Sequence, residues 1–471
     1  MLKNKSQTLK YIISDYIAAM LAWILFYYYR KYIIEYPIFG EIDFGLNIRL
    51  LIGAAVIPLL WILFYYLSGQ YRDPYYRSRL QELGQTITTT LIGSTILFFV
   101  VILDDYIGSY KDYYTSYFIL ISIHFTATYF PRLFITANMI KRLRSGKIGF
   151  NTIFIGGGTK TLDFYNTITS KYRSSGHIIK GFVAIHENST YQAVEKLQKL
   201  GYLKDIRKII IDNNIHEVII ASESREQQSI EQIIAKVEFM DVKIRLIPDM
   251  YNILTGRHVT SSLYGSPLLE ISHELLPAWQ ENTKRFIDVA GSLIAIVVGI
   301  PLYICMAIGV KLSSKGPILY SHERIGKFGK PFKIYKFRSM VVDAEKNGPA
   351  LSSETDTRVT PFGRFMRKSR LDEIPQFFNV LVGDMSLVGP RPERQFFIEQ
   401  IVLKAPLYKH LLRVRPGITS WGQVKYGYAE NVDQMVERLR YDLIYIESMS
   451  IYFDIKIMIY TIKTVFEGSG K

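Results

Sequence analysis

Cysteine and histidine are scarce in this chain of 471 residues, and their scarcity excludes several kinds of site. The single cysteine, Cys305, cannot form an intramolecular disulfide, and it excludes an all-cysteine metal site within one chain. Because Cys305 lies in an apolar run, we expect a small buried or lipid-facing hydrophobe. The histidines, including His322 and His410, show no spacing typical of metal ligands. We therefore expect neither a disulfide framework nor a zinc site.

Motifs for several common activities are also absent. No helix-turn-helix, zinc-finger or RNA-binding pattern accompanies the formal net charge of +15, so we expect no nucleic acid partner. Between Asn151 and Gln280 there is no Tyr-x-x-x-Lys pair of the kind that membrane-bound sugar-nucleotide dehydratases use. The chain also lacks an Asp-x-Asp metal motif, which counts against a glycosyltransferase that releases UDP. Anionic lipids and phosphorylated substrates remain as partners for the excess positive charge.

Long hydrophobic runs, in contrast, fill the first 140 residues. Four segments each reach about the 20 residues needed to cross a ~30 Å hydrocarbon core, and they lie near 11–29, 47–67, 84–103 and 113–137. Basic residues gather before the first segment, between the second and third, and after the fourth, and such flanks favour the cytoplasm. We predict four transmembrane helices over residues 1–147. Asp15, inside the first run, must face other helices or lie near an interface.

After residue 147 the pattern changes to short β-rich runs that alternate with amphipathic helical stretches. The runs NTIFIGGG, GFVAI, HEVIIAS and VKIRLIP predict an α/β domain with a mainly parallel sheet over 148–250. The first run ends in three glycines, 156–158, with Thr161 where a third fingerprint glycine would stand. Such a turn can present N–H groups to a phosphate, or it can simply pack a helix on a strand. Residues 251–280 indicate a linker with short strands.

A fifth hydrophobic segment, 286–312, is long enough to span a bilayer. Lys284 and Arg285 precede it and Lys311 lies near its end, which fits both ends on the cytoplasmic side. Pro301 near its middle removes a helix hydrogen bond and can break the segment into two arms. We therefore predict a re-entrant membrane hairpin broken at Pro301, with an ordinary fifth span as the alternative.

The most informative motif is SRLDEIPQFFNVLVGDMSLVGPRPE, from Ser369 to Glu393. It contains an adjacent acid pair, Asp372 and Glu373, followed by Pro375. Proline is harmless only where a helix has not begun to use its N–H donors, so we predict a helix N-terminus near Asp372. An ordinary helix capped by Ser369, with surface charges around it, would also fit this run alone.

Cations accompany the acid pair and favour a phosphate site over a simple capped helix. Four of them lie in this motif or in the upstream string KFRSM: Lys336, Arg338, Arg370 and Arg391. Pro390 and Pro392 stiffen the backbone on either side of Arg391, which suits a guanidinium that must meet an anion in one geometry. An acid pair among fixed cations beside a membrane-seeking segment indicates a site that handles phosphates.

Three long strings carry a resemblance to a known family: GPILYSHERIGKFGKPFKIYKFRSM, SRLDEIPQFFNVLVGDMSLVGPRPE and RPGITSWGQV. With these strings in the family's order, the region from about Lys284 onward resembles the polyprenyl-phosphate hexose-1-phosphate transferases, the monotopic phosphoglycosyl transferase superfamily. The resemblance implies a membrane α plus α/β protein with a four-helix transmembrane unit and a Rossmann-like middle domain. It also implies a monotopic α/β catalytic domain over 281–471 that contains the re-entrant helix.

The resemblance further implies a reaction. Asp372 would attack the β-phosphate of a UDP-sugar, release UMP and carry the sugar phosphate until undecaprenyl (polyprenyl) phosphate accepts it. Breaking a phosphoanhydride requires charge neutralisation, and a carboxylate nucleophile splits one hard exchange into two easier ones. Glu373 would be a Mg²⁺ partner or general base, with Asp372 and Glu373 as the expected metal ligands. The implied substrate-binding residues are Lys336, Arg338, Arg370, Arg391, Pro390, Pro392 and Arg324.

By the same resemblance we expect a multi-pass protein of the bacterial inner (cytoplasmic) membrane, bound to the lipid bilayer, with the middle and catalytic domains on the cytoplasmic face. A homodimer is also implied. The expected role is the first membrane step of capsule, exopolysaccharide or O-antigen repeat-unit synthesis. Two alternatives stay open: a non-catalytic membrane scaffold or regulator of polysaccharide assembly, and a glycosyltransferase that releases UDP. No run of residues identifies the sugar.

Overall fold

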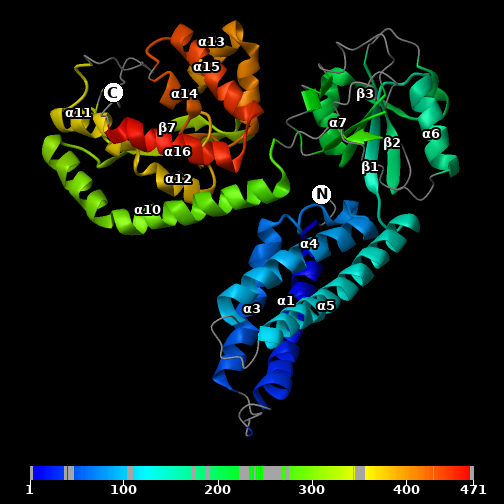
Figure 1. The fold of residues 1–471 in the computed structure, drawn as a ribbon. Coiled ribbons are helices and arrows are strands. Elements are labelled where there is room, and N and C mark those ends of the chain that lie inside the picture. The colour runs from blue at the N-terminus through cyan, green and yellow to red at the C-terminus, as the bar shows by residue number, and fades with distance from the viewer. Residues whose placement is uncertain are drawn as a thin grey trace. The chain divides into compact units, whose positions relative to one another are not determined.

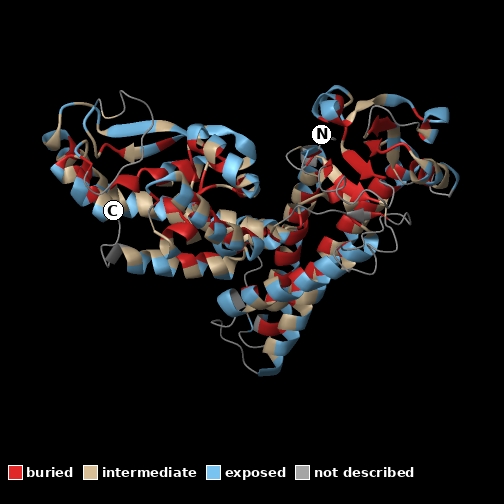
Figure 2. Ribbon diagram, turned by 90° about the horizontal axis from the view of Figure 1, so that it is seen from above, coloured by how far each residue is buried: buried red, intermediate tan, exposed pale blue. Residues whose placement is uncertain are grey.

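The computed structural model describes residues 4–36, 40, 47–102, 110–171, 176–185, 191–221, 233–234, 236–237, 240, 242–247, 268–270, 275–342, 344, 356–427 and 429–466. The chain forms two compact units, residues 1–273 and residues 274–471. Most of the predicted linker, residues 251–267, lies outside the described residues. Each unit has its own buried core (Figures 1 and 2).

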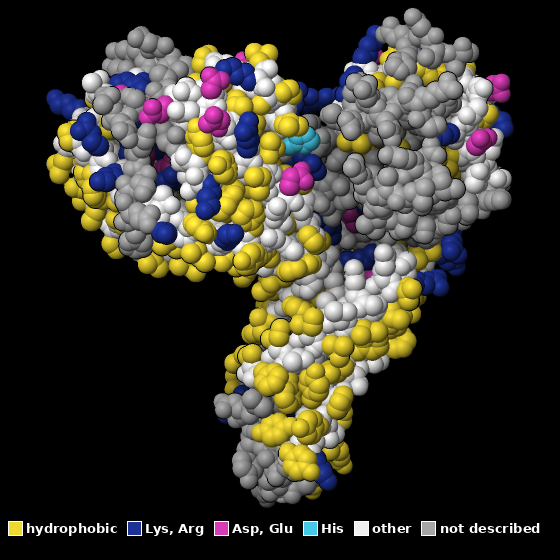
Figure 3. Space-filling model, turned by 45° about the horizontal axis from the view of Figure 1, so that its top comes forward, with side chains coloured by type: hydrophobic (Ala, Val, Ile, Leu, Met, Phe, Trp, Pro, Cys, Tyr) yellow, Lys and Arg dark blue, Asp and Glu magenta, His cyan; other side chains and the backbone are white. Residues whose placement is uncertain are grey.

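The first unit begins with a bundle of long apolar helices: α1 (Asn4–Tyr29), α3 (Ile48–Leu67), α4 (Arg79–Leu97) and α5 (Tyr110–Arg144). Helix α1 packs against α3 and α5, and α4 packs against α5. Single π-helical stretches extend α1 over Arg30–Glu35 and α4 over Phe98–Ile102. Large hydrophobic side chains lie on the outside of this bundle (Figure 3), the reverse of a water-soluble protein. The bundle is therefore built for lipid contact.

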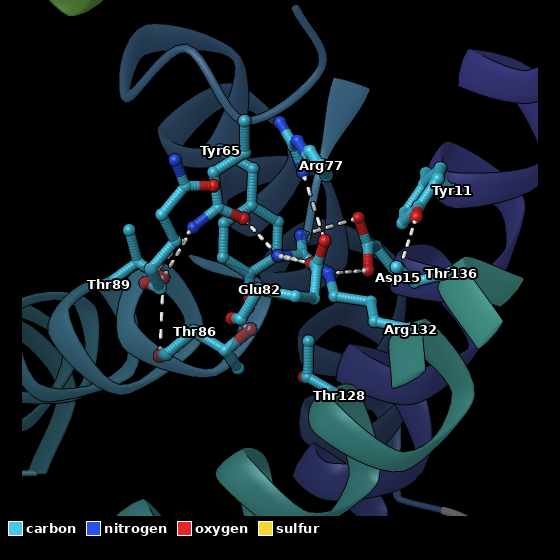
Figure 4. A network of polar contacts seen from close by, with 12 residues as sticks. Tyr11, Asp15, Tyr65, Arg77, Glu82, Thr86, Thr89, Thr128, Arg132 and Thr136 are labelled. Carbon is cyan, nitrogen blue, oxygen red and sulfur yellow. Dashed lines mark hydrogen bonds and ion pairs between the residues drawn. The ribbon is translucent and has the colours of Figure 1, made fainter. Parts of the chain in front are cut away.

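A network of charged side chains lies inside this bundle (Figure 4). Arg132 of α5 donates from Nε and Nη2 to the two carboxylate oxygens of Asp15 in α1, at 2.7 and 2.8 Å. Arg132 also donates to the Gln70 side chain and lies 3.5 Å from Glu82, which lies 3.4 Å from Arg77. A charge in an apolar setting is tolerated when it is paired. Of the two positions predicted for Asp15, facing other helices or lying near an interface, the first is therefore confirmed.

The remainder of the first unit is a six-stranded sheet with the order β3-β2-β1-β4-β5-β6. Its strands are β1 (Phe150–Ile155), β2 (His177–Ala184), β3 (Lys199–Tyr202), β4 (Glu217–Ile220), β5 (Lys243–Leu246) and β6 (Leu269–Glu270). All neighbours pair in parallel except β5 and β6. The prediction of a mainly parallel sheet is confirmed. Helix α7 (Ile206–Asp212) packs with Ile153 and Ile155, whereas α6 (Thr159–Lys171) packs with Phe154 between them, so the helices cover opposite faces.

The second unit is a mixed fold around a helical core. It opens with helix α10 (Ala278–Ser313) and an antiparallel hairpin of β7 (Leu319–Ile325) and β8 (Pro331–Phe337). The elements that follow are α11 (Pro361–Lys368), α12 (Gln376–Val382), β9 (Ser386–Val388), α13 (Gln395–Lys404), β10 (Gly417–Thr419), α14 (Trp421–Lys425), α15 (Val432–Glu447) and α16 (Ile451–Phe466). The short strands β9 and β10 pair in parallel. Helices α13, α15 and α16 share one hydrophobic cluster.

Helix α10 is one element that contains Pro301, where two separate arms were predicted. Its ribbon changes direction toward its C-terminal end (Figure 1), and a proline inside a helix is one of the recognised causes of such a bend. Its outer face carries exposed Leu293, Ile294 and Val298, and Cys305 is exposed as well. Within the described part of the chain, α10 and the four bundle helices are long and apolar enough to cross a membrane.

Candidate active site

The acid pair lies in a short connection between α11 and α12. Asp372 and Glu373 form a single 3₁₀ turn with Leu371, and α12 begins at Gln376 with Pro375 in its N-cap position. The predicted helix N-terminus near Asp372 was therefore a few residues early. Ser369 ends α11 and does not cap the next helix, since its Oγ donates to the Phe365 carbonyl at 2.9 Å.

Arg370 turns the chain sharply just before the acid pair. Its φ of 55° lies in the left-handed region, which costs a residue with a Cβ on the order of 1 kcal/mol. Such conformations persist where the surrounding structure holds them, and they cluster at functional sites. The strained turn sends the two acidic side chains back into the protein, where Asp372 is 7% exposed and Glu373 9% exposed.

Two of the predicted cations meet Glu373. Lys336 Nζ of β8 donates to Glu373 Oε1 at 2.6 Å, and an Arg391 Nη lies 3.6 Å from the same oxygen. Burial opposes ionisation of Glu373, but Lys336 and Arg391 outweigh it and hold the pKa of this carboxyl well below its usual range. Glu373 is therefore a fixed negative charge among fixed positive charges.

Asp372 has the opposite electrostatic setting. Burial, reinforced by the adjacent negative charge of Glu373, raises its pKa from 3.8 to about 6, although Lys336 acts against this shift. Within the described residues, no donor forms a hydrogen bond to its carboxylate. Two adjacent carboxyls with pKa values pushed apart commonly take different roles in one reaction. The charge of Asp372 is thus poorly compensated, whereas the charge of Glu373 is well compensated by its neighbours.

The loop that carries Arg391 is held by its backbone on both sides. The Pro390 carbonyl accepts a hydrogen bond from the Gly417 amide at 2.9 Å, and the Pro392 carbonyl accepts one from Arg324 Nη1 at 2.8 Å. Gly389 lies so close to β10 that an added Cβ would stand 2.4 Å from the Arg415 carbonyl oxygen. The GPRPE loop is thus clamped against β10, which fixes where the Arg391 guanidinium can reach.

Arg324 belongs to this clamp and not to the acid pair. Besides Pro392, its Nη1 reaches the carboxylate of Glu393 at 3.0 Å, and Arg438 of α15 donates to the other oxygen of Glu393 at 2.6 Å. Although Glu393 is buried, these arginines hold its pKa below its usual range. The sequence analysis did not single out Glu393 or Arg438, because nothing local marks a carboxylate that two distant arginines will enclose.

Of the remaining predicted cations, Arg370 lies close enough to the acid pair to act on its charge, whereas Arg338 contacts the end of α10. Arg338 turns away from the acid pair and donates to the carbonyls of Ser314 and Lys315 at 2.7 and 3.1 Å, which terminates α10. Arg370 acts on the pair electrostatically, as one of the charges that lower the pKa of Glu373. Arg367, in the last turn of α11, was not predicted; its charge opposes the upward shift at Asp372.

Comparison with known proteins places this site in a family. The family model described as bacterial sugar transferase matches residues 279–468, and a CoA-binding domain model matches residues 66–248. A putative undecaprenyl-phosphate N-acetylgalactosaminyl 1-phosphate transferase of Bacillus subtilis (strain 168) is 41% identical over 159 residues, which are 34% of this chain and 78% of that protein. The chain belongs to the bacterial sugar transferase family.

Two further relatives of this chain extend the comparison. The UDP-N-acetylgalactosamine-undecaprenyl-phosphate N-acetylgalactosaminephosphotransferase of Aeromonas hydrophila is 38% identical over 240 residues, 51% of this chain and 56% of that protein. The galactosyl transferase CpsE of Streptococcus agalactiae serotype III is 27% identical over 438 residues, 88% of this chain and 93% of that protein. The chain spans little more than half the length of the first of these relatives.

An apolar groove lies beside the acid pair. Its volume is about 640 Å³, and its walls include Tyr303 and Ala307 of α10, Leu319 and Phe337 of the hairpin, and Pro375 and Phe378 just after the acid pair. Tyr303 also donates to the Ile374 carbonyl at 2.8 Å, so α10 is tied to the backbone next to the acid pair. Pro375 lies two residues after Glu373 in the chain, so the groove lies next to the backbone of the acid pair.

The acid pair also fits a magnesium ion that is bound together with substrate. Across the described residues, no three His, Cys, Asp or Glu side chains stand together as a complete metal cage. Mg²⁺ is usually held by one or two carboxylates plus substrate phosphates and water. Asp372 and Glu373 supply that number of hard oxygen donors in a buried position. The residues present therefore fit Mg²⁺ as a partner of a phosphorylated substrate.

The glycine turn after β1 in the first unit is filled by packing. An added Cβ at Gly156 would stand 2.4 Å from the Ala221 carbonyl oxygen, and one at Gly157 would stand 2.5 Å from the Phe182 ring. Thr161 donates from its hydroxyl to the Gly156 carbonyl at 2.9 Å. Of the two interpretations left open by the sequence, these contacts support close packing of helix on strand.

Proposed function

We propose that this protein transfers a hexose-1-phosphate from a UDP-sugar to undecaprenyl (polyprenyl) phosphate and releases UMP. The observation that carries the proposal is the buried pair in which Asp372 has a raised pKa while Lys336 and Arg391 keep Glu373 ionised. The names of the Aeromonas hydrophila and Bacillus subtilis relatives, which describe transfer of sugar phosphates to undecaprenyl phosphate, support it.

In the first step, an Asp372 carboxylate oxygen attacks the β-phosphorus of the UDP-sugar. A bond forms between that oxygen and phosphorus while the bond from phosphorus to the bridging oxygen breaks, so UMP leaves with the bridging electrons. We assign Lys336 and Arg391, which both lie close to Glu373, to neutralising the charge of the pyrophosphate. Mg²⁺, when bound, would supply further neutralisation at the phosphate oxygens. A raised pKa makes the Asp372 carboxylate more basic than an ordinary aspartate.

In the second step, a phosphate oxygen of the lipid acceptor attacks the phosphorus held on Asp372. The new phosphoanhydride forms as the bond to the aspartyl oxygen breaks, and the carboxylate is regenerated. Glu373 is better suited to hold a metal ion than to accept a proton, because its low pKa makes it a weak base. We assign Glu373 to Mg²⁺ and Arg370 to electrostatic support of the same charges.

The apolar groove suits the first isoprene units of the acceptor, since its walls are apolar and Pro375, just after the acid-pair turn, is one of them. We propose that α10 dips into one leaflet and returns, so that the groove opens to lipid while the acid pair stays on the cytoplasmic side. The four bundle helices would cross the bacterial inner membrane. The homodimer implied by the family resemblance stays a prediction, as does the choice of polysaccharide pathway.

The test of the reaction is product analysis with purified full-length protein, Mg²⁺, polyprenyl phosphate and a panel of UDP-sugars. Wild type should release UMP with one donor, and Asp372→Asn should release none. Asp384→Asn, which removes an aspartate outside the acid pair, is the matched control and should retain activity. UDP as the product would replace this proposal with a glycosyltransferase, and no nucleotide product from any donor would favour a scaffold. Full activity of a folded Asp372→Asn protein would remove Asp372 as nucleophile.

The acceptor groove has a separate test. Ile304 and Ile308 both lie on α10 and are each 55% exposed, but only Ile304 lines the groove. We expect Ile304→Glu to lower transfer to polyprenyl phosphate at least about tenfold, because a carboxylate in the groove repels both the chain and its phosphate. Donor cleavage, followed as exchange of labelled UMP into UDP-sugar without acceptor, should be unchanged. Equal loss in Ile308→Glu would show that the groove itself is not involved.

A further inference from the structure

A second groove lies in the helix bundle, between the start of α4 and the last turns of α5. Its volume is about 550 Å³, and the proposed sugar transfer does not use it. Its walls are formed by Arg79 of α4 and six residues of α5: Phe134, Ala137, Asn138, Ile140, Lys141 and Arg144. Phe134, Asn138 and Lys141 recur at intervals of four and three along the helix, so they share one face.

The chemistry of this face changes in one direction along α5. Phe134 is 71% exposed, Asn138 offers an amide one turn later, and Lys141 and Arg144 lie in the last turns. At 1.5 Å rise per residue, Phe134 and Lys141 are roughly 10 Å apart along the helix axis. That length covers the passage from the hydrocarbon edge of a bilayer through its headgroup layer. The order of apolar, polar and cationic side chains matches the order of groups in a phospholipid.

The cations of this groove have no carboxylate partner in the part of the chain that the structure describes. Among the described residues, no carboxylate forms an ion pair with Arg79, Lys141 or Arg144. Glu82, on the next turn of α4 from Arg79, is buried and faces Arg77 and Arg132 instead. Three cations around one groove repel each other, and an anion between them would relieve that repulsion.

The position of Arg79 is fixed by the start of its helix. Ser78 accepts a hydrogen bond from the Gln81 amide at 3.1 Å, and the Gln81 side chain accepts one from the Ser78 amide at 3.0 Å, which is a capping box. Arg79 is the first residue of α4, a helix of 19 residues, so the positive end of its dipole adds to the three charges. The backbone that presents Arg79 to the groove is thereby held in place.

We propose that this groove binds an anionic phospholipid, with the phosphate among Arg79, Lys141 and Arg144 and an acyl chain along Phe134. Both helices are among those able to cross a membrane, and the cations stand at the bundle end that is predicted to be cytoplasmic. A soluble phosphate would use the cations alone and would leave Phe134 without a role. The ligand class is therefore a lipid with a negatively charged headgroup, independent of the sugar that is transferred.

The test is native mass spectrometry of the full-length protein in detergent with added phosphatidylglycerol or phosphatidylcholine. The variant is Arg79→Gln/Lys141→Gln/Arg144→Gln. The control is Lys10→Gln/Arg142→Gln/Lys147→Gln, which removes equal charge from exposed positions outside the groove. Each cation near an anionic headgroup is worth roughly fivefold in affinity, so the groove variant should bind phosphatidylglycerol about 100-fold more weakly than wild type. The control should change far less, and phosphatidylcholine binding should be equal in all three.

Several outcomes would overturn the proposal. Equal weakening in the groove variant and the control would mean that the protein attracts anionic lipid through net charge alone. If sn-glycerol-1-phosphate displaces phosphatidylglycerol at equal concentration, or if Phe134→Ala has no effect on lipid affinity, the ligand is a soluble phosphate. If polyprenyl phosphate binds there at least tenfold more tightly than phosphatidylglycerol, the groove is an acceptor site and not a phospholipid site.

Discussion

The buried charge of Asp372 should make the wild-type protein less stable than its Asp372→Asn variant at neutral pH. Folding raises the pKa of this carboxyl from 3.8 to about 6, since burial penalises its ionised form and Glu373 repels it. One pKa unit corresponds to about 1.4 kcal/mol. The ionised carboxylate therefore lowers the free energy of unfolding by on the order of 3 kcal/mol, a cost that the neutral amide avoids.

The sign of the pH dependence follows from proton linkage. Below about pH 4 the carboxyl is protonated in both the folded and the unfolded protein, so the variant and wild type should have similar stability. Between about pH 4 and pH 6 the unfolded chain binds fewer protons than the folded protein, so wild-type stability falls as pH rises. Above about pH 6 the full difference should be present and should stay constant.

Thermal unfolding of full-length protein in detergent measures this difference. For a unit of this size, 3 kcal/mol corresponds to a shift of roughly 6–12 °C in apparent melting temperature. Asp372→Asn, Asp384→Asn and wild type should be compared from pH 4.5 to pH 8 without metal or nucleotide. Only Asp372→Asn should gain stability, and only at the upper end of the range. Added Mg²⁺ should narrow the gap, since it would favour the ionised carboxylate of the wild type.

An Asp372→Asn protein that is less stable than wild type at pH 7.5 would refute this reasoning. Attraction to Lys336, Arg367 and Arg391 would then outweigh burial, and the Asp372 carboxylate would be a charge partner and not a destabilised nucleophile. A stability gain that does not vary with pH would also contradict it, because the effect would then come from side-chain packing. A confirmed gain would mean that the site gives up stability for reactivity.

Two further substitutions test the scaffold. Asp15→Ala leaves Arg132 buried without its main partner, so it should lower the free energy of unfolding by about 3–5 kcal/mol. In a melting experiment, replacing Arg132 by Met in the same chain should recover much of this loss. A double variant that is no more stable than Asp15→Ala would contradict the pairing. Gly417→Ala places a Cβ 2.1 Å from the Gly389 amide nitrogen, so it should displace the GPRPE loop and lower UMP release at least about tenfold. Gly84→Ala, which meets open space, is the control that should keep full activity.

Much of the secondary structure could be predicted because it depends on neighbours in the chain. The hydrophobic runs at 47–67 and 113–137 correspond to α3 (Ile48–Leu67) and the middle of α5 (Tyr110–Arg144). Burial on both faces of the parallel sheet produced the apolar runs that marked β1 and β4. Strand β3, Lys199–Tyr202, was not predicted, because at the sheet edge its residues are only partly buried and it has no such run.

The acid pair and the cations nearest to it could also be found in advance, because they belong to continuous motifs. The sequence could not show which cation forms an ion pair with which carboxylate. Lys336 reaches Glu373 across 37 positions of sequence, whereas Arg338, two residues further on, turns to the end of α10. Residues two apart in an extended strand point to the same side, but β8 ends at Phe337, and the sequence does not show that Arg338 lies beyond that end.

The sequence by itself determined the long apolar helices, the parallel sheet and the family of the second unit, because hydropathy, periodicity and contiguous motifs are local properties. Only the tertiary structure decided that Asp372 is buried with a raised pKa, and that Glu393 is enclosed by Arg324 and Arg438. It also decided that Arg79 and the end of α5 share one groove. Electrostatic pairing and burial depend on distances through space, and those distances exist only once the whole chain has folded.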